Sequence, residues 1–158
     1  MLRLNRMTDY GIVVLGQMAQ DVGRVRTAAA LAEASGVPVP TVSKLLKQMT
    51  AASLITARRG AKGGYSLDRP AAAVTVTEII QALEGPIALT ACVDGAEDSC
   101  DVEHSCPMRG NWNRVNRAIR AALDAVTLAD MLDPDGMFPV RPPLTATLHA
   151  AVPVGAAE

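Results

Sequence analysis

The three cysteines of this chain all lie in one polar, acidic run between residues 92 and 106, which cannot be part of a hydrophobic core. They are Cys92, Cys100 and Cys106. A free thiol usually behaves as a small buried hydrophobic group, and three thiols in a hydrophilic loop cannot all do so. Their odd number argues against a closed disulfide framework. The run is therefore predicted to be a loop that binds a metal ion or an iron–sulfur cluster through thiolates, with redox-active or incidental cysteines as the alternative.

The composition favours packed helices and a cytoplasmic protein. The 158 residues are 49% hydrophobic but include only one Trp, two Tyr and one Phe. An aliphatic core of this kind suits helices better than an aromatic-rich β-sandwich. The first six residues lack the apolar core of a secretory signal, and no stretch is long enough to span a bilayer. We therefore expect no association with a membrane, and thiols that stay reduced.

Charge divides the chain into two unlike halves. Residues 1–70 carry ten Arg and Lys against four Asp and Glu, whereas residues 71–158 carry five against twelve. The basic half is the expected face for a polyanion, and the acidic half holds the cysteines. This asymmetry predicts a nucleic-acid reader joined to a sensor.

The basic half is predicted to contain a helix-turn-helix. A first helix is expected over residues 9–20 with Thr8 as its cap. A second is expected over residues 28–35, capped by Thr27 and ended by Gly36. The second of these helices is the first helix of the motif, and the turn follows it.

A third helix over residues 40–49 completes the motif, because Pro40 suits a first helical turn, where its missing N–H costs nothing. The helix carries hydroxyl and amino groups on Thr41, Ser43, Lys44 and Lys47. Two helices joined by a short turn, the second bearing such groups, form the DNA-binding helix-turn-helix. A plain helical hairpin with solvated lysines is the alternative.

A short β-hairpin is predicted directly after the third helix. Residues 54–57 and 65–67 are its expected strands, and the turn between them, residues 58–64, is basic and rich in glycine. A hairpin in this place is a wing, whose glycines let the backbone approach a phosphate and whose arginines can enter a minor groove. A solvated turn is the alternative, but the preceding motif favours contact with DNA.

The acidic half is predicted to contain further helices. Thr75 and Glu78 form a capping box at the start of a short helix that ends at residues 85–86. After the cysteine run, apolar residues recur every three or four positions, at Trp112, Val115, Ile119, Leu123 and Val126. Such a stripe must bury against something, and we expect a dimer seam rather than an intramolecular groove.

The expected division of the chain has four parts. They are a winged helix-turn-helix DNA-binding domain (1–86), a cysteine-rich cluster-binding loop (87–107), a dimerisation helix with a short following helix (108–132) and a flexible tail (133–158).

An ordered set of segments resembles the IscR/NsrR family, which are dimeric winged-helix regulators that sense iron–sulfur clusters. The segments are residues 4–19, 31–49, 59–65 and 84–87 and the triple-cysteine loop. The opening Leu-x-x-x-Thr-Asp-Tyr-Gly, here Leu4 to Gly11, is most similar to the branch that regulates the SUF cluster-assembly operon. The resemblance covers roughly residues 1–132. It implies a mainly α fold, a winged helix-turn-helix with a small β-hairpin wing and a long C-terminal dimerisation helix.

Carried over by position, the resemblance implies the residues that contact DNA. The recognition helix would place five residues at or near the major groove: Pro40, Thr41, Ser43, Lys44 and Lys47. Arg59 corresponds to the wing arginine that enters the minor groove.

The resemblance also implies cluster ligands. Cys92, Cys100 and Cys106 correspond to three of them, although the first gap holds seven residues where the family commonly has five. Arg109 replaces the His that follows the third cysteine in the assembly-regulator branch, and it cannot be a ligand. Asp9 occupies the place of a ligand in the nitric-oxide-sensor branch and is our candidate for the fourth, from the same or the partner subunit. His104, solvent or a small thiol is the alternative.

We therefore expect a transcriptional regulator that senses a [2Fe–2S] or [4Fe–4S] cluster. It would bind a palindromic operator in double-stranded DNA as a homodimer and repress genes of cluster assembly. A winged-helix DNA-binding protein with a structural zinc or a thiol redox switch is the alternative, and a cluster carrier is another. We expect neither an enzyme nor a small-molecule substrate, because the chain lacks a Cys-x-x-Cys pair, a Ser/His/Asp constellation and a dinucleotide fingerprint.

Overall fold

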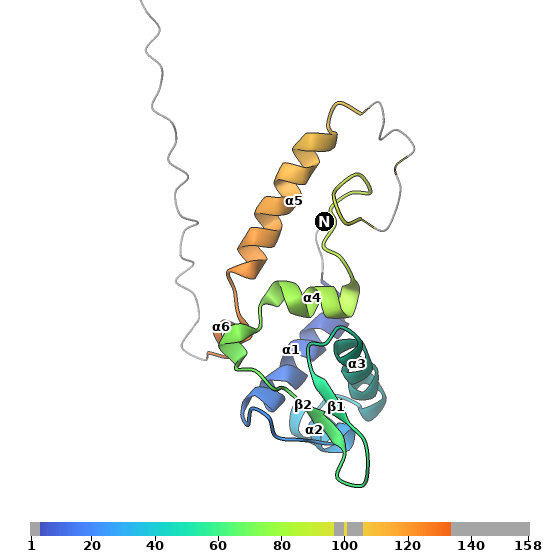
Figure 1. Cartoon of the computed structure of the whole chain (residues 1–158), viewed down its shortest axis with the longest axis vertical. Helices are drawn as coiled ribbons and strands as arrows, with labels where there is room; N and C mark the ends of the chain where they lie inside the picture. The colour runs from blue at the N-terminus through green and yellow to red at the C-terminus, as the bar shows by residue number, and fades with distance from the viewer. Residues whose placement is uncertain (1–3, 97–99, 101–105, 134–158) are drawn as a thin grey trace, which may run out of the picture.

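The computed structural model describes residues 4–96, 100 and 106–133, and shows a mainly helical chain with one β-hairpin. The elements are α1 (Arg6–Ala19), α2 (Ala28–Ser35), α3 (Val39–Ala51), β1 (Thr56–Arg58), β2 (Gly64–Ser66), the 3-10 turn η1 (Ala71–Ala73), α4 (Val76–Glu84), α5 (Arg109–Asp124) and α6 (Leu128–Leu132). Helix α5 extends away from the other elements, on the side opposite the loop between β1 and β2 (Figure 1). Apart from residue 133, the predicted tail lies outside the described residues, as does His104.

One aliphatic core holds the first four helices together. Helix α1 contacts α2, α3, α4 and α6. The core is built from Leu, Val, Ile and Met side chains, as the low aromatic content predicts; those without any exposure are Val14, Leu15, Leu31, Val42, Leu45, Leu46, Met49, Leu67, Val74, Ile79 and Leu128. Each such side chain stabilises the fold by about 1.5–3 kcal/mol relative to an exposed position.

Two glycines in α1 let other helices approach it closely. A Cβ atom at Gly11 would collide with the Leu83 side chain of α4. A Cβ atom at Gly16 would lie 2.6 Å from Cδ2 of Leu132 in α6. The residues between α4 and α5 (85–108, the cysteine segment) and α5 itself lie between α4 and α6 in the chain. The helices that precede and follow this part of the chain therefore both pack on α1.

The start of α1 differs from the prediction. The helix begins at Arg6 rather than residue 9, and Asn5 caps it by accepting a hydrogen bond from Met7 N–H at 3.2 Å. Thr8, the predicted cap, is fully buried inside the first turn. Its hydroxyl donates to the carboxylate of Glu84 at the end of α4. A long-range acceptor therefore takes the hydroxyl that the local pattern assigned to a cap.

The other predicted helix signals are confirmed, with shifted ends for α3. Thr27 caps α2 through Ala30 N–H, and Gly36 ends it with φ +70. Helix α3 starts one residue before Pro40 and continues to Ala51, two residues beyond its predicted end. Thr75 and Glu78 form the expected capping box of α4.

The hairpin lies slightly away from its predicted position. Leu54 and Ile55 were expected in its first strand, but they are buried in the core and the strand begins at Thr56. The second strand begins at Gly64 and ends before Leu67, whose carbonyl accepts from Gly23 N–H at 2.8 Å. The strands are antiparallel, with Ala57 opposite Tyr65.

The return from α5 is fixed beside the start of α4. Val76 N–H donates to the carbonyl of Val126 at 2.9 Å, and Leu128 N–H donates to the carbonyl of Val74 at 2.7 Å. Val126, predicted at the end of the apolar helical stripe, therefore belongs to this link and not to α5. A second capping box, between Thr127 and Asp130, begins α6.

The carboxylates of the two capping boxes should make stability fall in acid. Hydrogen bonds from the Thr127 side chain and backbone lower the pKa of Asp130. Partial burial raises the pKa of Glu78, but hydrogen bonds from Thr75 and the Arg69 guanidinium outweigh it and hold that pKa below its usual value. Because the folded state favours both charged forms, their stabilisation is present above the ordinary values of 4.5 and 3.8 and is lost as pH falls through the lower folded-state values.

Urea unfolding of wild type and Glu78→Gln at several pH values between about 6 and 3 measures this loss. The Glu78→Gln variant should be less stable than wild type at pH 6 and should lose less stability on acidification. Glu33→Gln, on the exposed face of α2, is the charge-matched control and should be as stable as wild type at pH 6. Parallel profiles for wild type and Glu78→Gln would contradict the assignment.

Candidate functional site

Helix α3 has one buried and one exposed face. Its apolar positions Val42, Leu45, Leu46 and Met49 are buried in the core. The opposite positions Pro40, Ser43, Lys44 and Lys47 are exposed, and Thr41 is half-buried. The structure therefore places four of the five predicted groove residues on one solvent face and the fifth at its margin.

Strand β2 of the hairpin is held to the segment before α2 by backbone hydrogen bonds. Arg26 N–H donates to the carbonyl of Tyr65 at 2.9 Å, and Tyr65 N–H donates to the carbonyl of Arg26 at 2.8 Å. This approach requires Gly64, where φ is +156 and a Cβ atom would lie 2.5 Å from the carbonyl oxygen of Arg26. Because two segments fix the strand, the loop projects in a defined direction.

The cations of α3 and the hairpin loop are available to a ligand. Among the described residues, ion pairs within 4.0 Å join Arg24 and Arg26 to Asp21, and Arg69 to Glu78. None of Lys44, Lys47, Arg59 and Lys62 has such a partner in that part of the chain. At the base of the hairpin, the hydroxyls of Ser66 and Thr56, and then the charge of Arg58, lower the pKa of Asp68.

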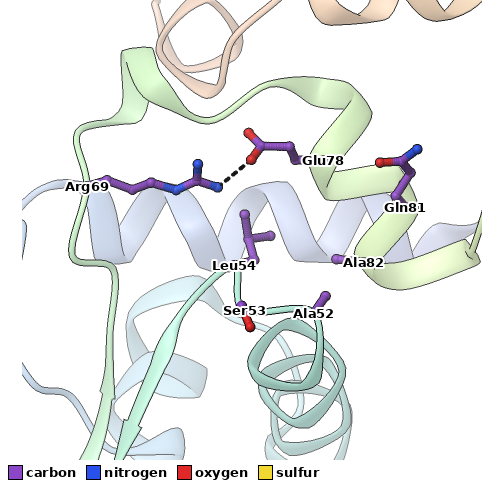
Figure 2. A pocket seen from close by; sticks show the side chains of 7 residues that line it. All are labelled: Ala52, Ser53, Leu54, Arg69, Glu78, Gln81 and Ala82. Atoms are coloured by element: carbon purple, nitrogen blue, oxygen red, sulfur yellow. Dashed lines mark hydrogen bonds and ion pairs between the residues drawn. The ribbon is translucent and has the colours of Figure 1, made fainter.

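A pocket of about 420 Å³ lies between the end of α3 and α4 (Figure 2). It is lined by Ala52, Ser53, Leu54, Arg69, Glu78, Gln81 and Ala82. Two of these residues form an ion pair at its wall, with 2.8 Å between the Arg69 guanidinium and the Glu78 carboxylate. Because its two charged groups bind each other, Arg69 is not among the unpaired cations, and the pocket beside α3 is not a candidate ligand site.

The cysteine segment begins at a link to α1. The Glu84 carboxylate accepts from Asn5 N–H at 2.8 Å and from the Thr8 hydroxyl, so it satisfies donors at the start of α1. Gly85 then ends α4 with φ +91. This link brings the first turn of α1, which carries Asp9, beside the start of the segment; Asp9 itself is exposed.

The three cysteines are free, half-buried thiols. Cys92 Sγ lies 3.2 Å from the Thr90 hydroxyl. As a donor set, three reduced thiols in a polar loop suit an iron–sulfur cluster or zinc. Within residues 4–96, 100 and 106–133, however, no three His, Cys, Asp or Glu side chains gather closely enough to hold a metal ion. The structure thus does not bring the predicted ligands together, and His104 lies outside the residues that it describes.

Helix α5 presents an apolar face to solvent. Trp112 and Val115 are 40% and 43% exposed, and Ile119 and Leu123 are half-buried. Nothing within the described part of the chain covers Trp112 and Val115 completely, as the prediction of a dimer seam requires. None of the described helices is both long and apolar enough to cross a membrane.

Comparison with known families decides the class of this protein. A family model described as "Rrf2: Iron-dependent Transcriptional regulator" matches residues 4–134. The chain belongs to the Rrf2 family of transcriptional regulators. Rrf2 regulators bind DNA, typically as dimers, and they are not enzymes.

Solved structures of Rrf2-type regulators share this winged-helix fold. CymR (YrzC), the global cysteine regulator of B. subtilis, is 27% identical with a TM-score of 0.60, over 84% of this chain and 97% of that one. T. potens IscR is 29% identical with a TM-score of 0.57, over 83% of this chain and 86% of that one. An oxidized form of Staphylococcus aureus CymR is 26% identical with a TM-score of 0.56, over 84% and 97% of the two chains. The resemblance drawn from the sequence is therefore confirmed at the level of Rrf2 regulators.

Two features of this Rrf2 site escaped sequence reasoning. The contact of Thr8 with Glu84 joins residues 76 apart in the chain, and no local pattern reports it. Asn116 interrupts the apolar stripe of α5 between Trp112 and Ile119 and is only 3% exposed. A polar residue within an otherwise apolar helical stripe was the available signal.

The wing of this Rrf2 protein should be sensitive to Gly64→Ala. The added methyl group meets the Arg26 carbonyl, and alanine rarely adopts this φ value. We expect a loss of about 1–3 kcal/mol in the free energy of unfolding. Urea denaturation checks it, with Gly110→Ala as control, because nothing lies within 4 Å of a Cβ atom there. Equal stability of Gly64→Ala and wild type would show that the strand is not held as described.

Proposed function

We propose that this Rrf2 regulator is a homodimeric repressor that reads a palindromic operator and senses an iron–sulfur cluster, with genes of cluster assembly as its target. The observation that carries the DNA half is the exposed face of α3, whose lysines have no ion-pair partner in the described chain, next to a hairpin fixed by Arg26 and Tyr65. The sensing half rests on the three free thiols and on the resemblance to IscR/NsrR regulators.

Each protomer would contact DNA with two elements. Lys44 and Lys47, with the hydroxyls of Thr41 and Ser43, would bind phosphates and base edges of a major groove, and Pro40 would lie there in the first turn of the helix. Arg59 would enter the neighbouring minor groove, where narrow sequences attract arginine. Apolar side chains of two α5 helices would bury each other in the dimer and set the distance between the two α3 helices. Major grooves on one face of DNA repeat at about 34–36 Å, so a small change in that distance alters the fit.

The thiolates of Cys92, Cys100 and Cys106 would hold the cluster, with Asp9 of the same or partner subunit as the fourth ligand and His104 as the alternative. When bound, the cluster would supply a centre that responds to iron supply and to oxidants. It would need all of its ligands to remain bound. The three cysteines lie in the cysteine segment, which starts after Glu84, beside α1, and ends where α5 begins. Regulation follows if one state of this segment suits the operator-binding distance better than the other.

Operator affinity should depend steeply on salt. If the two protomers neutralise about eight phosphates, affinity falls by roughly 10³–10⁵ between 50 and 200 mM salt. Lys47→Ala should weaken binding to all sequences and reduce the salt slope by about 2, one unit per protomer. Arg59→Ala should also weaken the preference among bases in the minor groove. Fluorescence anisotropy on labelled operators measures both effects.

Arg24→Ala is the matched control, because it removes an exposed positive charge that is already paired with Asp21 at 2.8 Å. Its affinity and salt slope should equal those of wild type. A flat salt response of wild type, or equal effects of Lys47→Ala and Arg24→Ala, would refute the proposed interface.

Metal content decides between the cluster and its alternatives. Protein purified without oxygen should be brown and contain about two or four iron and sulfide per chain, and Cys92→Ser should lose most of both. Elemental analysis and the visible spectrum measure this. A colourless protein with one zinc per chain would select the structural-zinc alternative. Absence of both metals after reconstitution would leave a thiol switch, for which the proximity in fold to an oxidized form of Staphylococcus aureus CymR is the supporting observation.

A further inference from the structure

Helix α5 holds the cysteine segment through a buried asparagine. Asn116 is 3% exposed, and both ends of its amide are used. Its Oδ1 accepts from Leu89 N–H at 3.2 Å, and its Nδ2 donates to the carbonyl of Ile87 at 3.0 Å. The side chain therefore pairs with the backbone at two positions of the segment, as a neighbouring strand would.

A second asparagine repeats the contact one helical turn earlier. Asn113 Oδ1 accepts from Asp94 N–H at 2.8 Å. Val93, next to that residue, is only 5% exposed, so the segment is also anchored by an apolar side chain. Cys92 lies between the two points of attachment, Leu89 and Asp94.

These contacts concern the backbone of the segment and not its side chains. A hydrophobic residue at position 116 would leave the N–H of Leu89 and the carbonyl of Ile87 without their present partners in a part-buried place, which is costly. The asparagines also stand on the flank of α5 next to its exposed apolar face, on which Trp112 and Val115 are 40% and 43% exposed. One helix thus contacts the cysteine segment on one flank and offers an apolar surface on the next.

We propose that Asn113 and Asn116 are positioning residues that fix Cys92 against α5 and transmit the state of the cysteine segment to that helix. The first part, the fixing of the segment, stands on the hydrogen bonds alone. The second part, the transmission of a cluster signal, rests on the proposed function. Glu84 holds the start of the same segment to Asn5, the cap of α1, and to Thr8 in the first turn of that helix, so the segment connects α1 to α5.

The first test uses the full-length, reduced, metal-free protein. Backbone amide exchange of Leu89 and Asp94, followed by NMR, should be slow in wild type. Asn113→Ala should accelerate the exchange of Asp94 at least tenfold, and Asn116→Ala should do so for Leu89, because each change removes the side-chain oxygen that accepts the amide hydrogen bond. Asn113→Asp keeps an acceptor for Asp94 N–H and should exchange as wild type does.

Asn111→Ala is the control on the same helix, because Asn111 is exposed and, among the described residues, its side chain hydrogen-bonds the Met108 sulfur, at 3.9 Å, and not the cysteine segment. It should leave both exchange rates unchanged. Circular dichroism and the unfolding midpoint show that each variant is folded. If Asn116→Ala does not fold, Asn113→Ala, at a half-buried position, still tests the contact at Asp94. Wild-type exchange in Asn113→Ala would overturn the proposal.

The second test uses protein reconstituted with ferrous iron and sulfide without oxygen. Asn113→Ala should lose its visible absorbance to a chelator several-fold faster than wild type, and the ratio of operator affinities between loaded and metal-free protein should shrink towards one. Asn113→Asp and Asn111→Ala should keep both wild-type values. Unchanged loss rates and an unchanged ratio in Asn113→Ala would overturn the transmission.

The two tests separate failure of the clamp from failure of the proposed function. If wild type takes up no cluster, the sensing proposal and the transmission both fall, while amide exchange still decides whether the asparagines fix the segment. If wild type takes up a cluster and Asn113→Ala behaves like wild type in both tests, the clamp is wrong and cluster sensing stands.

Discussion

The structure depends on how closely α1 can be approached. Leu83 of α4 and Leu132 of α6 pack onto α1 at Gly11 and Gly16, positions where a side chain would collide with them. The part of the chain that contains the cysteine segment and α5 is therefore preceded and followed by a residue that packs on α1. Under the proposed function, a change in the segment would therefore act on a helix that also packs against α3, the proposed reader of the major groove.

The hairpin shows how a short, weak element acquires a fixed direction. Two strands of three residues are marginal by themselves. Arg26 adds a third stretch of backbone through its two hydrogen bonds with Tyr65, and Gly64 removes the side chain that would block it. The unpaired charge of Arg59 is thus carried on a loop whose base is fixed to the same core as α3, as the proposed contact of both elements with one DNA duplex requires.

Local signals predicted most of the fold. Thr27 and Gly36 bound α2, and Thr75 with Glu78 begins α4, because a cap and its helix are only a few residues apart and depend little on the remaining structure. The prediction was wrong for Thr8, a good cap by residue type that is instead buried against Glu84. Leu54 and Ile55 have strong strand propensity, but burial in the core outweighed it.

The sequence by itself determined that the cysteines lie outside any core, that α3 carries cations and that α5 has an apolar stripe, since charge, polarity and helical spacing are properties of neighbouring residues. Only the tertiary structure decided which polar groups meet. Glu84 reaches α1 and Asn116 reaches the backbone at Ile87 and Leu89 because distant segments were brought side by side by burial of apolar surface. Hydrogen-bonding groups are satisfied by whatever lies beside them after that burial, and no spacing rule along the chain states what that will be.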